Sequence, residues 1–262
     1  MEVVIQTSKK RAEELAAAII AQQISEKPAS TLGLATGRTM EPVYAELARH
    51  HKDDGLDFTK VCSFNLDEYI GLPPDHKESY RYYMNEMLFD HINIKAGNTH
   101  LPDGMADNIE EECHNYERKI HANGGIDIQL LGIGRSGHVG FNEPMSSLSS
   151  RTRIKTLTKS TFEQNGPLFD DPSEMPMHAL TMGVATIMEA RYCLMLITGS
   201  EKAEITAKFI EGPITSMVTA SILQMHPKVT VILDEDAAAN LTMKEYYSWV
   251  YDNKPGWQNL HD

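Results

Sequence analysis

Residues 132–144 read Gly-Ile-Gly-Arg-Ser-Gly-His-Val-Gly-Phe-Asn-Glu-Pro and follow an apolar run at 126–131 that predicts a buried strand. So many glycines in a short loop are costly unless the backbone turns sharply or approaches a ligand closely. His138 and Glu143 lie in the same loop. An ordinary turn with a core histidine is the alternative. We favour a ligand site, because open α/β folds place their ligands where a strand ends in such a loop.

Strand-like and helix-like segments alternate along the rest of the chain. Apolar runs predict strands at 1–5, 31–35, 60–66, 126–131, 191–198 and 229–233. Periodicity predicts helices at 8–25, 41–51, 79–88, 107–121, 201–210 and 216–223, whereas 161–176 looks irregular and 234–262 mixes a helix with polar residues. This order predicts one α/β domain over residues 1–262, with a Rossmann-like, open, mostly parallel sheet and helices on both faces.

The charge of the chain limits its partners. The formal net charge is -13 and the isoelectric point is about 5.3. A nucleic-acid binder normally presents a basic face, so nucleic acid is not an expected partner. A small anionic substrate remains compatible, because a few local cations and amide groups can hold a phosphate.

Cysteine usage and hydropathy indicate the compartment. The three cysteines form no Cys-x-x-Cys pair, which argues against a disulfide framework or a cysteine-rich zinc site. The start of the chain shows no secretory signal, and no apolar run approaches membrane-spanning length. We therefore expect a cytoplasmic protein without a membrane partner.

Polar residues follow three of the predicted strands. They are the loop at 36–39, the pair Asp67-Glu68 and the glycine-rich loop itself. Carboxyl ends of parallel strands meet at one edge of a sheet, so the three sites can converge on one crevice. A helix N-terminus after the first loop favours phosphate, while a carboxylate and an imidazole suit proton transfer next to a carbonyl. A solvated acidic turn is the alternative for Asp67-Glu68.

The chain resembles the glucosamine/galactosamine-6-phosphate isomerase family, which includes glucosamine-6-phosphate deaminases. Two long motifs carry the resemblance: Phe-Asn-Leu-Asp-Glu-Tyr-Ile-Gly-Leu-Pro at 64–73 and Gly-His-Val-Gly-Phe-Asn-Glu-Pro at 137–144. Shorter matches at 34–37, 149–157, 199–202 and 223–227 extend it over nearly the whole chain. It implies conversion of glucosamine 6-phosphate and water to fructose 6-phosphate and ammonia, with neither a metal nor an organic cofactor.

The resemblance also implies roles for particular residues. Asp67 would remove the C2 proton and return one at C1, His138 would assist opening of the pyranose ring, and Glu143 would orient His138. The substrate phosphate would be held by Gly37, Arg38, Thr39 and Lys202.

The chain departs from the family pattern in two places. Ser136 stands where the family carries an aspartate, and a hydroxyl can hydrogen-bond to His138 but cannot supply a full negative charge. A phosphate-clamping arginine of the best-known members falls near Pro167, and Arg38 is the expected substitute, with Arg135 as a second candidate cation. Galactosamine 6-phosphate is therefore the alternative substrate.

The resemblance further implies regulation and assembly. Bacterial relatives form hexamers that bind N-acetylglucosamine 6-phosphate between subunits, and that phosphate would contact Ser146, Arg153 and Lys155 here. We therefore expect a homo-oligomer, hexameric by resemblance. A non-catalytic sugar-phosphate sensor and a phosphogluconolactonase-like hydrolase are the less favoured alternatives to a deaminase.

Overall fold

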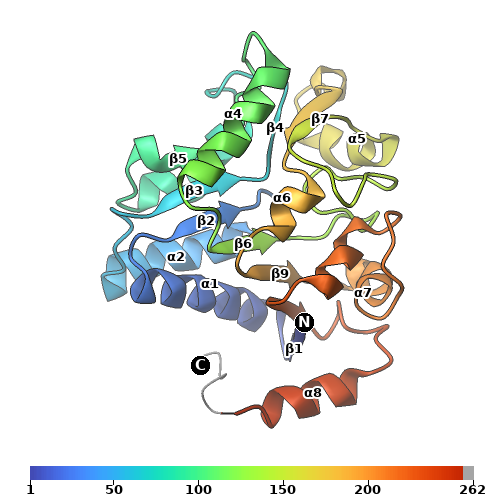
Figure 1. The fold of residues 1–262 in the computed structure, drawn as a ribbon. Helices are drawn as coiled ribbons and strands as arrows, with labels where there is room; N and C mark the ends of the chain where they lie inside the picture. The colour runs from blue at the N-terminus through green and yellow to red at the C-terminus, as the bar shows by residue number, and fades with distance from the viewer. Residues whose placement is uncertain (256–262) are drawn as a thin grey trace.

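The computed structural model describes residues 1–255, apart from the side chain of Gln164, so residues 256–262 of the predicted C-terminal tail lie outside the described residues. Within this range, seven parallel strands form the central sheet (Figure 1). From one edge to the other they are β1 (Glu2–Gln6), β10 (Val229–Asp234), β9 (Cys193–Ile197), β6 (Ile128–Leu131), β2 (Thr31–Leu34), β3 (Cys62–Asn65) and β5 (Thr99–His100).

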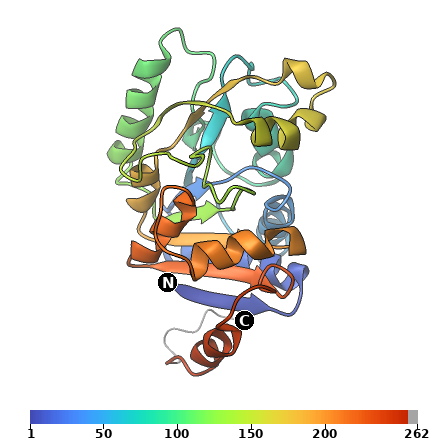
Figure 2. The same ribbon diagram turned by 90° about the vertical axis from the view of Figure 1, so that its right-hand side faces the viewer.

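Helices cover both faces of this sheet, and their ends follow from local sequence. Besides α5 (Lys159–Asn165), the α-helices within residues 1–255 are α1 (Lys9–Glu26), α2 (Glu41–Asp54), α3 (Tyr80–Met87), α4 (Ile109–Ala122), α6 (Val184–Met188), α7 (Ala203–Ile210) and α8 (Lys244–Asp252). Ser8, Ser79 and Asn108 accept backbone N–H groups as N-caps of α1, α3 and α4. Helix α8 lies beyond the β1 edge of the sheet (Figures 1 and 2). Among residues 1–255, none of the helices combines the length and apolar character that a membrane crossing requires.

A second, three-stranded antiparallel sheet stands apart from the central one. Its order is β4 (Asp67–Tyr69), β8 (His178–Thr181) and β7 (Arg153–Thr156), and α5 (Lys159–Asn165) follows β7 in the chain. Figure 1 shows β4, β7 and α5 together at the top of the molecule. An apolar cluster of its own supports this sheet: Tyr69, Leu72, Phe141, Leu157, Phe169, Met175 and Ala179.

The structure confirms the Rossmann-like α/β architecture and corrects three local expectations. The segment 161–176 is not irregular throughout, because α5 occupies its beginning and two 3₁₀ turns follow at Gly166–Leu168 and Pro172–Glu174. The helix expected at 216–223 is a 3₁₀ helix, Thr219–Met225. The strand expected at 60–66 ends at Asn65, and Asp67 begins a strand of the other sheet.

The strand order places four loops side by side. Strands β9, β6, β2 and β3 are neighbours and run parallel, so the loops after them leave the same edge of the sheet. The order reverses at β2, since β3 and β5 extend the sheet on one side of it and β6 on the other. A crevice at such a reversal is where open α/β sheets bind their ligands.

Candidate active site

The loop after β6 wraps tightly around its own histidine. A Cβ atom on Gly134 would lie 2.0 Å from the imidazole Nε2 of His138, so the ring rests directly on this glycine. Gly137 and Gly140 adopt φ values of 83° and 56°, which L side chains rarely take. The glycines of this loop therefore serve both purposes that their density suggested, a sharp turn and a close approach.

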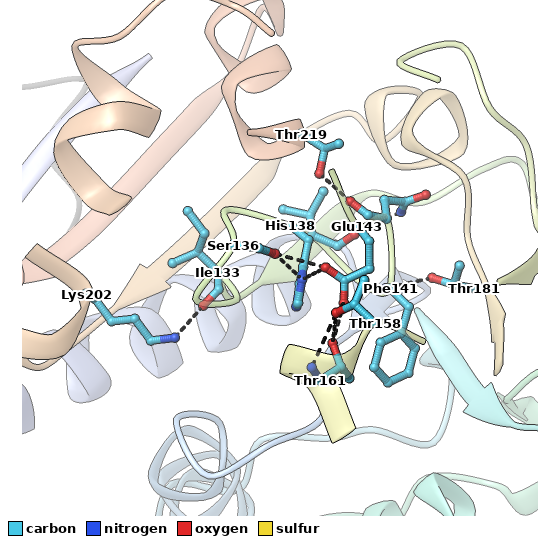
Figure 3. Close-up of polar contacts among 12 residues, drawn as sticks. Ile133, Ser136, His138, Phe141, Glu143, Thr158, Thr161, Thr181, Lys202 and Thr219 are labelled. Carbon is cyan, nitrogen blue, oxygen red and sulfur yellow. Dashed lines mark hydrogen bonds and ion pairs between the residues drawn. The ribbon is translucent and has the colours of Figure 1, made fainter. Parts of the chain in front are cut away.

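Three side chains of this loop form one hydrogen-bonded group (Figure 3). The Nδ1 of His138 lies 2.8 Å from Oε2 of Glu143 and 2.8 Å from Oγ of Ser136. The Ser136 hydroxyl donates to the same Oε2 at 3.0 Å. The carboxylate fixes the proton of the imidazole on Nδ1 and leaves Nε2 free for acid-base work. Ser136 thus joins the His138–Glu143 pair through hydrogen bonds to both partners.

The second oxygen of Glu143 is held by another part of the chain. Thr158 donates to Oε1 at 3.2 Å, and Thr161 donates to the same atom. Burial raises the pKa of Glu143, but the bonds from His138, Thr161 and Ser136 outweigh it and lower this pKa to about 2. The carboxylate is therefore ionised throughout the physiological range.

Asp67 is a buried carboxylate that faces the same loop. Its exposed fraction is 6%, and an ideal Cβ on Gly140 would lie 3.3 Å from its Oδ2. Among residues 1–255, no side chain or backbone group donates a hydrogen bond to this carboxylate. Burial, together with the charge of Glu68, raises the pKa of Asp67 to about 8. When it is ionised, such a carboxylate is a stronger base than an exposed aspartate, and it lacks a hydrogen-bond partner of its own.

Glu68 has a structural task. Its Oε1 accepts the backbone N–H groups of Tyr69 at 2.8 Å and Tyr80 at 2.9 Å, and its Oε2 accepts that of Arg81 at 2.9 Å. These bonds satisfy free N–H groups in the first turn of α3 and tie this helix to β4. Burial raises the pKa of Glu68 to about 7, even though these donors favour its charged form.

The predicted phosphate loop lies after β2, next to the His138 loop. Gly37 has a φ of 117°, and its carbonyl oxygen accepts a hydrogen bond from the Tyr83 hydroxyl at 2.9 Å. Gly37 and Arg38 are exposed and Thr39 is half-buried. Arg38 forms no ion pair within residues 1–255. Its guanidinium is thus available to an anion from outside the chain.

Lys202 approaches the site from the loop after β9. Its Nζ donates to the carbonyl oxygen of Ile133 at 2.9 Å, at the start of the glycine-rich loop (Figure 3). Burial lowers the pKa of Lys202, and the neighbouring Arg135 lowers it further. Lys202 and Arg135 are thus two cations on one side of the crevice, and no contact joins either of them to Arg38 in the described chain.

Two of the three predicted effector contacts, Arg153 and Lys155, belong to β7, and the third, Ser146, follows the glycine-rich loop. Arg153 and Lys155 lie on one side of this strand, and burial lowers the pKa of both. Arg153 donates to Oδ1 of Asn142 at 2.9 Å. The Ser146 hydroxyl is buried without a hydrogen-bond partner, while its backbone N–H donates to the Glu143 carbonyl at 3.0 Å. The Ser146 hydroxyl is therefore a buried donor that is free to bind an anion, and Lys155 interacts electrostatically with Glu143 of the glycine-rich loop.

The sequence interpretation missed two residues of this site. Thr158 and Thr161 fell at the border of a stretch that looked irregular, although Thr-x-x-Thr is a possible helix N-cap signal. Thr158 does cap α5 by accepting the N–H of Thr161 at 3.3 Å. In the part of the chain that the structure describes, no three His, Cys, Asp or Glu side chains are placed to hold a metal ion.

Known protein sequences are similar to this chain over almost its full length. The model of the family described as glucosamine-6-phosphate isomerases/6-phosphogluconolactonase matches residues 5–232. A glucosamine-6-phosphate deaminase of Arthrobacter sp. (strain FB24) is 50% identical over 260 residues, 99% of this chain and 100% of the relative. One of Hahella chejuensis (strain KCTC 2396) is 48% identical over 250 residues, 95% of each chain.

Solved structures agree in fold. A monomeric glucosamine-6-phosphate deaminase has a TM-score of 0.90 and is 44% identical, with 92% of this chain and 100% of that chain covered. A 6-phosphogluconolactonase from Trypanosoma cruzi has a TM-score of 0.73 at 22% identity, with 92% and 97% covered. At that identity the second structure supports the fold alone.

Proposed function

The chain belongs to the glucosamine-6-phosphate isomerase/6-phosphogluconolactonase family, and we propose that it converts glucosamine 6-phosphate and water to fructose 6-phosphate and ammonia. The observation that carries the proposal is the buried, unpartnered carboxylate of Asp67 against Gly140 in the loop of His138. A base and an acid-base imidazole at one crevice are what an aldose–ketose isomerisation requires.

His138 serves the first step, the opening of the pyranose ring. Its Nε2 is the free nitrogen, because Nδ1 is engaged by Glu143 and Ser136. Nε2 accepts the proton of the C1 hydroxyl and delivers a proton to the ring oxygen, and the bond between C1 and the ring oxygen breaks to give the open-chain aldehyde. The Glu143 carboxylate stabilises the charged imidazole while this proton is in place.

Asp67 serves the second step, the proton transfer between C2 and C1. The aldehyde acidifies the C2–H bond, the carboxylate removes this proton, and a proton returns at C1 to give a ketose imine. Water then hydrolyses the imine and releases ammonia. Without substrate, burial raises the pKa of Asp67. The positively charged amino group of a bound substrate lowers this pKa again and so favours the ionised form of Asp67.

The cations of the crevice hold the substrate phosphate in this proposal. Arg38 and the backbone N–H groups at 37–39 approach it from β2, and Lys202 approaches it from β9. Neither a metal nor an organic cofactor has a part in these steps. The three cysteines are free, which fits a reducing compartment, so we propose the cytoplasm as the place of action.

Release of ammonia tests the reaction and the substrate together. The purified protein is incubated with glucosamine 6-phosphate and, separately, with galactosamine 6-phosphate. We expect faster release from the glucosamine sugar, given the 44–50% identity with glucosamine-6-phosphate deaminases. Faster release from galactosamine 6-phosphate would reassign the substrate. No release from either sugar would overturn the enzyme assignment and favour the sensor.

Regulation and assembly form a second proposal, based on Ser146, Arg153 and Lys155. The unpartnered Ser146 hydroxyl and the two half-buried cations suit the phosphate of N-acetylglucosamine 6-phosphate. The homo-oligomer stays a prediction, and the similar structure of a monomeric deaminase provides the alternative. Sedimentation gives the oligomeric state, and sigmoidal kinetics that become hyperbolic with the effector would support the regulatory site.

A further inference from the structure

Glu143 is held at both of its oxygens, and the two sets of donors come from different parts of the chain. Oε2 contacts His138 and Ser136 of the glycine-rich loop, whereas Oε1 contacts Thr158 and Thr161 at the start of α5. We propose that Thr161, supported by Thr158, is a positioning residue for the reaction: it fixes Glu143 so that Oε2 keeps His138 in its working tautomer. The expected changes in kcat rest on the proposed function, the release of ammonia from glucosamine 6-phosphate.

Burial makes the donors at Oε1 necessary. The Glu143 side chain is 3% exposed and Thr161 is 5% exposed, so bulk water is excluded from this end of the carboxylate. A buried charged oxygen without a donor is costly, and the carboxylate would turn to share its other donors. Such a turn would break the 2.8 Å contact between Oε2 and Nδ1 of His138. Thr161 opposes this turn, because its hydroxyl donates to Oε1, where the Thr158 hydroxyl adds a longer bond at 3.2 Å.

The position of Thr161 in α5 links this contact to the rest of the site. The first turn of α5 is fixed by Thr158, which caps the helix and whose hydroxyl lies 3.1 Å from that of Thr161. At its other end, Asn165 donates to the Tyr69 hydroxyl at 3.0 Å, two residues beyond Asp67. The helix therefore contacts both the carboxylate that orients His138 and the strand that carries the base. The position of α5 therefore decides whether Glu143 has its donors at Oε1.

Few other charges act on this carboxylate. Besides His138 within the loop, Lys155 of β7 interacts electrostatically with Glu143. On α5, Lys159 and Glu163 are exposed and pair with each other. Removal of the Thr161 hydroxyl thus changes the hydrogen bonds of Glu143 without removing a charge.

The test compares three variants of similar shape. Thr161→Val removes the hydroxyl and keeps the volume, and Thr161→Ser keeps the hydroxyl. Thr219→Val is the matched control: Thr219 is 1% exposed and donates to the carbonyl oxygen of Asn142 at 2.7 Å, next to Glu143, but does not touch its carboxylate. We expect Thr161→Val to lower kcat roughly 10- to 100-fold, as loss of a bond to a charged group does, with KM within about twofold. Thr161→Ser should restore most of kcat.

A spectroscopic readout makes the result independent of catalysis. The Nδ1–H proton of His138 should give a strongly downfield NMR signal in the substrate-free protein, because it is bound to a carboxylate. We expect this signal to shift in Thr161→Val and to stay in place in Thr161→Ser and Thr219→Val. An unchanged signal in Thr161→Val, or an equal loss of kcat in Thr219→Val, would overturn the proposal. A shifted signal in a protein that releases no ammonia would leave the positioning role standing and refute the proposed function instead.

Discussion

Substitution of Gly134 by alanine tests whether the close contact beneath His138 is needed for activity. The new Cβ would lie 2.0 Å from Nε2, 2.3 Å from Cδ2 and 2.4 Å from Cε1 of the imidazole. Ordinary contacts between such atoms are about 3.5–4.0 Å, so the ring must move by about 1.5 Å. That movement carries Nδ1 out of hydrogen-bond range of Glu143, which it now contacts at 2.8 Å.

The expected loss follows from this displacement. A misplacement of about 1 Å in a catalytic group costs on the order of 100-fold in rate, so we expect kcat to fall by about that factor or more. If the loop moves instead of the ring, overpacking should destabilise the protein by about 1–3 kcal/mol, or very roughly 2–10 °C in Tm for a chain of this size. Ammonia release and thermal melting measured on one preparation separate the two effects.

Gly132 provides the control in the same loop. An alanine Cβ there meets only the end of the flexible Met40 side chain, at 3.0 Å, and neither glycine has a positive φ. Gly132→Ala should therefore keep kcat within a few-fold of the parent protein. A Gly134→Ala variant with more than half of the parent kcat would refute the reasoning, as would an equal loss in both variants.

Four further predictions concern three charged groups. Asp67→Asn should lower kcat by about 10²- to 10⁴-fold, and near-normal activity would show that the base is misassigned. The folded-state pKa of Asp67 is about 8, against an ordinary value of 3.8, so the parent protein loses stability as the pH rises from 3.8 to 8. In urea unfolding at pH 9, Asp67→Asn should therefore be more stable than the parent protein. Glu143 behaves oppositely, because its folded-state pKa of about 2 lies below the ordinary 4.5. Its ionised form stabilises the parent protein above pH 4.5, and this stabilisation is lost as the pH falls toward 2. A Glu143→Gln variant whose unfolding has the same acid dependence as that of the parent would contradict this prediction. Arg38→Ala should raise KM for the sugar phosphate roughly tenfold with little change in kcat, and an unchanged KM would exclude Arg38 from the phosphate site.

The sequence predicted the fold class and the location of the candidate site because both depend on local patterns. Apolar runs that end in glycine or polar residues indicate parallel strands, and the loop at 132–144 carried its imidazole and carboxylate within six residues. The topological argument that strand ends meet at one edge needed no distances. The structure places Asp67 beside Gly140, although it lies in β4 of the small sheet and not at the end of a strand of the parallel one.

The remaining features depend on contacts between distant segments. Asp67 looked like the end of a strand, but it belongs to β4, whose partner β8 lies more than 100 residues further along the chain. Thr158 and Thr161 reach Glu143 only because β7 and α5 fold back over the catalytic loop. No pattern of period 2 or 3.6 reports such pairings, and short elements with three to seven residues carry little periodicity.

The small sheet acts as a mechanical spacer of fixed length. Thr181 of β8 pairs with Asp67 on one side and with Arg153 on the other, so these positions lie two strand spacings apart, about 9–10 Å. Backbone hydrogen bonds resist stretching in this direction, and a force on the β7 edge displaces the β4 edge with it. An engineer who wished to make the base respond to a new signal would therefore alter the outer edge of β7 and leave every residue of the crevice unchanged.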